Sequence, residues 1–278
     1  MKIAVLNSSG NVGKSTITKN LIYPRLENAL IVEVETYNDS NIGNKNLNII
    51  NYDVNADISE LYLNMIEIEN IIVDVGASNI SQFFEKILEF DGLLNLFDYF
   101  VIPTVSTLKE TKDTIKTINF LQNLDISESK IKVVLNKVKK DVKIEFDTLM
   151  KNSPVTIDID IFIKETKLFS DLNLLRMDIS EVYKEDLDFY KNKILSADTS
   201  QEKMRYIKID MCNRMSQNII RNFDEIFNKL FNKDIRFSFS TAKDEIKKDN
   251  KISQKKVEKV EKKEFLEVEI NLEESEDF

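Results

Sequence analysis

Short apolar runs alternate with segments of helical periodicity from the first residues to about residue 161, and this alternation constrains the fold more than any other feature. Most of the runs are continuously apolar and rich in β-branched residues, which indicates strands buried on both faces of a sheet. Strand–helix alternation of this kind predicts an α/β fold with a doubly wound, mostly parallel sheet. The expected strands cover residues 3–6, 30–34, 70–75, 99–105, 131–135 and 155–161.

The segments between these runs carry apolar residues at the spacing of one helix face. The strand pattern fades after residue 163, and helices are expected from there on. The Met, Ile and Phe residues of the last helix indicate packing on the sheet or on another helix, with an interaction surface as the alternative. We therefore expect one domain over residues 1–235, with its C-terminal helices at about 178–233. The expected helices cover residues 14–23, 58–68, 80–96, 108–124, 142–150, 180–196 and 202–231.

Residues 241–278 differ in composition from the rest of the chain. Lys and Glu dominate this segment, and residues 264–278 contain seven acidic residues and no basic residue. Such a segment has little apolar area to bury, so we expect a charged, disordered tail with an acidic end. The tail either keeps the chain in solution or docks a partner.

Composition excludes several classes of site. The chain has no histidine and one cysteine, Cys212, which removes Ser-His and Cys-His nucleophile pairs and zinc sites built from cysteines. The net charge of −9 argues against a protein that coats DNA with its whole surface. The chain begins with a strand-like run and has no stretch of ~18 uncharged apolar residues, so we expect a cytoplasmic protein without a membrane span.

The loop after the first expected strand contains Ser-Gly-Asn-Val-Gly-Lys-Ser-Thr at residues 9–16. This matches the phosphate-binding pattern G-x-x-x-x-G-K-[ST], except that Ser8 stands at the first glycine. In such a loop the backbone N–H groups surround the phosphates, the lysine reaches the terminal phosphates, and a hydroxyl holds Mg²⁺. The sequence therefore predicts a nucleotide site, with a structural strand–helix turn as the alternative. The expected contacts come from Gly10, Asn11, Val12, Gly13, Lys14, Ser15 and Thr16.

Two further expected strands end in carboxylates. Asp74 follows the apolar run 71–73, the pattern of a Walker B acid that holds Mg²⁺ directly or through water. Glu33 and Glu35 lie two residues apart on one strand, so they point the same way. Glu35 lies nearer the edge of the sheet where ligands bind, and a carboxylate there could orient an attacking water. The alternative is a pair of surface acids on an edge strand.

The loop in KIAVLNSSGNVGKSTITKNLIYPRL (residues 2–26), the acidic pair in IVEVET (31–36) and the run IIVDVG (71–76) together resemble the deviant-Walker ParA/MinD-type ATPases. Within that group they look most like the StbB-type plasmid partition or stability proteins. The resemblance implies a P-loop NTPase fold, ATP with Mg²⁺, and a nucleotide-dependent switch in plasmid maintenance. It also implies a DNA-bound partner protein and an ATP-dependent homodimer.

The resemblance also implies roles for individual residues. Lys14 matches the phosphate-binding and catalytic lysine, and Ser15 and Asp74 match the metal ligands. Glu33 or Glu35 falls where the family has its second-strand acids. Asn136, in the Asn-Lys pair that follows a strand, matches the residue that contacts the adenine; an ordinary turn asparagine is the alternative.

The loop departs from the family at two positions. Ser9 stands where ParA-type proteins have a signature lysine that reaches the phosphates of the dimer partner, and Asn11 replaces a later glycine. ATP binding should survive because the backbone groups and Lys14 remain. Without the signature lysine, we expect hydrolysis to be slow or to be activated by a partner, since one positioned cation can contribute ~10³–10⁵ in rate.

Basic residues concentrate in residues 130–143 and recur along the last helix. We expect solvated helix faces there, with non-specific contact to DNA phosphates as the alternative. Two rival functions remain beside the switch ATPase: a nucleotide-binding adaptor that does not hydrolyse, and a metabolic P-loop kinase or ligase. The switch predicts ATP-dependent association and hydrolysis stimulated by a partner. The adaptor predicts ATP binding without turnover, and the metabolic enzyme predicts phosphorylation or ligation of a small acceptor. The basic residues that recur along the last helix include Lys203, Arg205, Lys208, Arg214 and Arg221.

Overall fold

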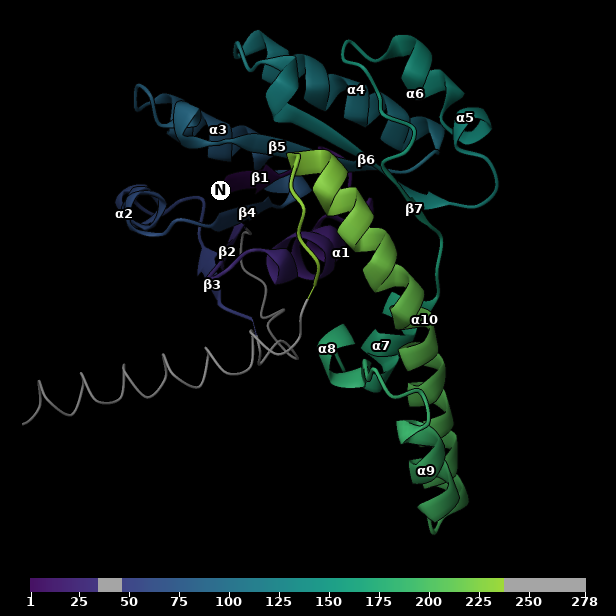
Figure 1. Cartoon of the computed structure of the whole chain (residues 1–278). Coiled ribbons are helices and arrows are strands. Elements are labelled where there is room, and N and C mark those ends of the chain that lie inside the picture. The colour runs from purple at the N-terminus through teal and green to yellow at the C-terminus, as the bar shows by residue number, and fades with distance from the viewer. Residues whose placement is uncertain (35–46, 238–278) are drawn as a thin grey trace, which may run out of the picture. The chain divides into compact units, whose positions relative to one another are not determined.

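The computed structural model describes residues 1–34 and 47–237 (Figure 1). The chain divides into two units at Arg236, of which the first, Met1–Arg236, contains the elements reported below. The tail expected at residues 241–278 lies outside the described residues, as does Glu35.

The sheet of the first unit has seven strands in the order β3-β2-β4-β1-β5-β6-β7. Every pair of neighbours is parallel, which confirms the predicted parallel α/β sheet. β2 and β4 are buried along their whole length, as continuous apolar runs predict. The strands are β1 (Lys2–Val5), β2 (Leu30–Val34), β3 (Ile49–Tyr52), β4 (Ile71–Val75), β5 (Tyr99–Thr104), β6 (Ile131–Val138) and β7 (Phe162–Lys164).

Helices cover both faces of the sheet (Figure 1). One face packs against α2, α3, α4 and α6 through residues such as Phe83, Ile118 and Leu149. The other face packs against α1, the π-helical turn η1 and α10. The predicted doubly wound arrangement is therefore present. The helices are α1 (Lys14–Ile17), η1 (Thr18–Ile22), α2 (Ser59–Glu67), α3 (Ile80–Leu88), α4 (Leu108–Asn123), α5 (Val142–Glu145), α6 (Asp147–Asn152), α7 (Leu168–Leu175), α8 (Ile179–Val182), α9 (Phe189–Ser196) and α10 (Ser200–Phe231).

The last strand lies later than predicted. The alternating run at residues 155–161 is not a strand; β7 begins at Phe162, which pairs with Leu135 of β6. A turn occupies the end of the run, because the Asp158 carboxylate accepts a hydrogen bond from the Asp160 N–H and the Asp158 carbonyl accepts one from the Ile161 N–H. Alternation alone therefore gave the wrong strand position.

Several helices are shorter than predicted. The helix expected at 80–96 ends at Leu88, before Gly92 adopts a left-handed φ of 82°. The helix expected at 142–150 is interrupted at Phe146, whose side chain is buried, and the one expected at 180–196 is divided into α8 and α9. β3 and α7 were not predicted.

The long helix α10 begins with a capping box formed by Thr199 and Glu202. Its C-terminal part buries Phe223, Phe227 and Phe231 in the core on one face of the sheet. Its N-terminal part contacts α7, α8 and α9. The predicted packing role of its apolar residues is confirmed for this C-terminal part. Among the described residues, no helix combines the length and the apolar character needed to cross a bilayer.

Candidate functional site

The loop between β1 and α1 is fastened to its neighbours by Asn7, whose side chain is fully buried. The Asn7 amide donates to the Pro103 carbonyl (2.8 Å) and to the Thr114 hydroxyl (2.9 Å). Its side-chain oxygen accepts from the Ser9 N–H at 2.9 Å. These bonds tie the start of the loop to β5 and α4, so the loop geometry is set before any ligand binds.

Two residues of the loop have left-handed backbones: Asn11 (φ 59°) and Gly13 (φ 96°). A Cβ at Gly13 would lie 2.3 Å from Nδ2 of Asn136, so glycine is required there by both conformation and space. Gly10, Asn11 and Ser15 are exposed, which leaves this part of the loop open to a ligand. The described loop thus has the exposed small residues that a phosphate cradle needs.

The ammonium of Lys14 lies over the loop. It donates to the carbonyl oxygens of Asn7 (3.2 Å) and Ser9 (2.9 Å). Ser9 itself is buried, and its hydroxyl has no hydrogen-bond partner among the described residues. The Ser9 side chain is therefore enclosed by the protein and supplies no cation to the loop.

The two predicted metal ligands, Ser15 and Asp74, lie next to each other beside the loop. Asp74, at the end of β4, is 5% exposed, and its Oδ2 has no hydrogen-bond partner within the described part of the chain. The pKa of Asp74 is raised to about 6, mainly by burial and also by the nearby Glu33, while a side-chain hydrogen bond with Ser15 and the charges of Lys14 and Lys19 act in the opposite direction.

The chemistry of this pair fits Mg²⁺. Mg²⁺ prefers oxygen ligands and is commonly held by one or two carboxylates together with substrate phosphates and water. Among the described residues, no group of three His, Cys, Asp or Glu side chains forms a cage that would hold a metal without such help. A hydroxyl at Ser15 and a buried carboxylate oxygen at Asp74 suit a metal that arrives with a phosphate.

Glu33 is not a surface acid. It is 6% exposed and lies on β2, an internal strand, where it is the direct neighbour of Asp74 on β4. Its carboxylate forms an ion pair with Lys19 of η1, with 2.7 Å between Nζ and Oε1. The alternative of two surface acids is therefore wrong for Glu33. Lys19 was missed because a lysine five residues after Lys14 carries no pattern that points to a strand acid.

Asn136, near the end of β6, holds the loop. Its side-chain amide donates to the Val12 carbonyl at 2.8 Å, and its side-chain oxygen accepts from the Lys137 N–H. The Lys137 ammonium donates to the Asn11 carbonyl at 3.1 Å. Asn136 is thus more than a turn residue, and the adenine contact stays a prediction. Lys137 was not predicted to touch the loop.

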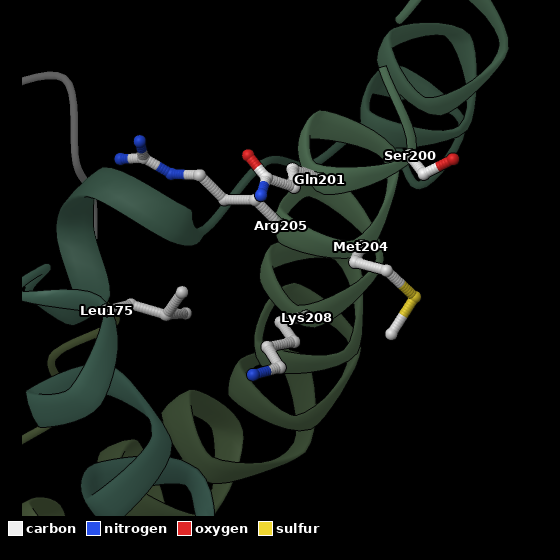
Figure 2. Close-up of a pocket in the computed structure, with 6 residues that line it drawn as sticks. All are labelled: Leu175, Ser200, Gln201, Met204, Arg205 and Lys208. Carbon is white, nitrogen blue, oxygen red and sulfur yellow. The ribbon is translucent and has the colours of Figure 1, made fainter.

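Three of the basic residues at 130–143 have separate partners. Lys130 donates to the Phe97 carbonyl, Lys132 lies over the Tyr99 ring, and Lys139 pairs with Glu165. On α10, Arg205 and Lys208 line a hollow of about 430 Å³ together with Leu175 and Met204 (Figure 2). The residues that line this hollow come from α7 and α10, and none belongs to the loop at residues 8–16.

The chain is similar in structure to the ParA family ATPase from Chlorobium tepidum, with a TM-score of 0.51 and 16% identity over 76% of this chain and 97% of that one. The fold is the P-loop NTPase fold. The MinC:MinD cell division protein complex of Aquifex aeolicus gives a TM-score of 0.48 and 16% identity over 78% of this chain and 95% of that one. No protein-family model matches the sequence, and no curated protein does. The P-loop fold places the ends of β1, β2 and β4 at one edge of the sheet, where the loop and the two acids meet.

Proposed function

We propose that the chain is a Mg²⁺-dependent ATPase that acts as a nucleotide-dependent switch in plasmid partition or maintenance. One observation carries the proposal: Ser15 lies beside the buried Asp74, whose Oδ2 has no hydrogen-bond partner among the described residues, next to a loop in which Gly10 and Asn11 are exposed. A buried carboxylate oxygen without a partner costs free energy in the folded protein. Such an atom at the mouth of a P-loop is explained by a metal ligand.

The loop residues would bind the phosphates, and Ser15 and Asp74 would bind the metal. The backbone of Gly10, Asn11, Val12 and Gly13 binds the phosphates, with Lys14 reaching the terminal ones and Thr16 lying at the start of the helix. Ser15 and Asp74 would hold Mg²⁺, which would neutralise charge on the phosphate oxygens. These assignments rest on the motif and on the placement of its residues in the fold.

The other roles complete the proposal. Glu35 would orient the attacking water; it lies outside the described residues. Asn136 would contact the adenine with the part of its amide that does not bond Val12. A DNA-bound partner protein would recognise the nucleotide state, and two copies would associate when ATP is bound. The partition role and the StbB-type assignment rest on the sequence resemblance, and we place the protein in the cytoplasm.

The replacement of the signature lysine by Ser9 supports slow or partner-activated hydrolysis. Ser9 is buried and contributes its carbonyl to Lys14 rather than a charge to the phosphates. The same observation favours a second candidate function, an adaptor that binds ATP without turning it over. The two differ in one measurable property, which is turnover in the presence of the partner.

The test is ATP turnover by the wild type and by Lys14→Ala, with and without DNA and the product of the neighbouring gene. We expect the substitution to lower turnover by about 10²–10³-fold, because it removes a cation that contacts the transferring phosphate. Lys139→Ala, which removes an exposed lysine paired with Glu165, is the control and should behave like the wild type.

Undiminished turnover in Lys14→Ala would overturn the loop assignment. ATP binding by the wild type without turnover under any of these conditions would support the adaptor instead.

A further inference from the structure

Two buried carboxylates lie side by side at the edge of the sheet. Glu33 and Asp74 are direct partners in the β2–β4 register and are 6% and 5% exposed. Neighbouring carboxylates in such a place repel each other, and burial disfavours the charge of both. A nearby positive charge therefore stabilises the two carboxylates in this place.

Lys19 supplies this charge. Its ammonium lies 2.7 Å from Glu33 Oε1, and its side chain is 19% exposed. Its charge also acts on Asp74, as does that of Lys14. Lys14, however, donates to two carbonyl oxygens of the loop. The residue comes from η1, a π-helical turn directly after the loop helix, and such turns are frequent at functional sites.

We propose that Lys19 is a built-in counter-ion that holds Glu33 and Asp74 together without a metal and weakens the attraction of the site for Mg²⁺. The cation repels a divalent ion at Asp74, so the site binds Mg²⁺ only when nucleotide phosphates add their own negative charge. Lys19 is thus a positioning residue that links Mg²⁺ binding to nucleotide binding. The inference rests on the proposed function, because Mg²⁺ is the ligand that it names.

The experiment uses Lys19→Met, Glu33→Gln and the double variant in the full chain. Two quantities are measured: the thermal midpoint in EDTA, and the Mg²⁺ concentration that half-saturates binding of a fluorescent ATP analogue. Lys139→Met, in the exposed Lys139–Glu165 pair, is the matched control and should change neither quantity.

We expect Lys19→Met to lower the EDTA midpoint by about 6 °C or more, because it leaves buried carboxylates uncompensated. It should also lower the half-saturating Mg²⁺ concentration by about 5-fold, since a repelling charge is gone. Glu33→Gln should raise that concentration by about 5-fold. The double variant should return close to the wild-type half-saturating Mg²⁺ concentration and be more stable than Lys19→Met alone.

If Lys19→Met does not fold, Glu33→Gln and the charge-preserving Lys19→Arg still test the Mg²⁺ effect. Lys19→Arg should stay close to the wild type.

Additive effects of the two substitutions on the thermal midpoint would overturn the counter-ion role. An unchanged or higher Mg²⁺ requirement in Lys19→Met would also overturn it. A failure of the proposed function looks different: the wild type would bind the analogue equally well with and without Mg²⁺, whatever the EDTA midpoints show.

Discussion

The segment that follows the P-loop contains the basic residues of two ion pairs, Lys19–Glu33 and Arg25–Asp224. The two pairs have different surroundings. Arg25 is 5% exposed and pairs with Asp224 of α10 at 2.8 Å. Lys19 pairs with Glu33 at 2.7 Å, beside Asp74. The first pair is enclosed by further hydrogen bonds, whereas the second has a neighbouring carboxylate oxygen without a partner in the described structure.

The details of the Arg25 pair show a purely structural role. The guanidinium donates to the carbonyl oxygens of Asn20, Leu21 and Ile220 as well as to Asp224. Its charged group also lies over the Phe223 ring. These contacts join the end of the first helical segment to α10. The donors of Arg25 are thus occupied within the fold, whereas a buried acceptor without a partner needs a further explanation, which a metal ligand provides at Asp74.

The largest change in the free energy of unfolding is expected for Arg25→Met, which removes the Arg25–Asp224 ion pair. Removing one partner of a buried pair leaves Asp224 uncompensated, so we expect the free energy of unfolding to fall by about 3–5 kcal/mol. Urea unfolding measures this change, and Arg221→Met on the exposed face of α10 is the control, with an expected change within about 0.5 kcal/mol.

The affinity of the folded Arg25→Met protein for ATP should stay at the wild-type value. If ATP binding were lost at urea concentrations where the variant is still folded, the two ion pairs would not be independent and the comparison would fail.

The second prediction concerns the pH dependence that Asp74 contributes. Its pKa is about 6 in the folded protein and near the ordinary aspartate value of 3.8 when unfolded. Between these pH values the folded state binds more protons than the unfolded state, so this group lowers stability as the pH rises from about 4 to 6. The shift of about two pH units corresponds to a cost of about 2–3 kcal/mol at pH 7.

Asp74→Asn removes the titrating group and should therefore raise the free energy of unfolding at pH 7 by about 2 kcal/mol. Its stability should also vary less between pH 4 and 6 than that of the wild type, as measured by urea unfolding across this range. Its ATP binding should lose its dependence on Mg²⁺. A variant less stable than the wild type at pH 7 would show that Asp74 is compensated in the fold as fully as Asp224.

Local patterns predicted the parts of the molecule that depend on neighbouring residues in the sequence. The continuous apolar runs of β2 and β4 identified internal strands because burial on both faces leaves no polar positions. The loop with Lys14 and Ser15 was found because its chemistry lies within a few consecutive residues. That Asp74 would lie near them followed from the parallel sheet, whose strand ends share one edge.

The contacts between distant segments could not be predicted in the same way. The pair Lys19–Glu33 depends on how η1 lies over β2, and the bond from Asn136 to Val12 joins residues 124 positions apart. Neither produces a periodic signal. β7 was misplaced because the alternation at residues 155–161 is typical of an edge strand, whereas the turn at Asp158 depends on local hydrogen bonds.

The smallest effect is expected at Asn136, which belongs to neither side of the comparison: it holds the loop and is also predicted to touch the base. Asn136→Ala removes the 2.8 Å bond to the Val12 carbonyl, which should cost about 1 kcal/mol, or about 5-fold in affinity for tripolyphosphate. Calorimetric titration with tripolyphosphate and with ATP measures the affinity of the variant for each ligand.

Asn152→Ala, which removes an exposed hydrogen bond to the Thr148 carbonyl, is the control. A loss for ATP greater than for tripolyphosphate is expected if the amide also contacts adenine, because tripolyphosphate has no base. Equal losses would limit Asn136 to holding the loop, and an unchanged affinity for tripolyphosphate would show that the loop keeps its shape without Asn136.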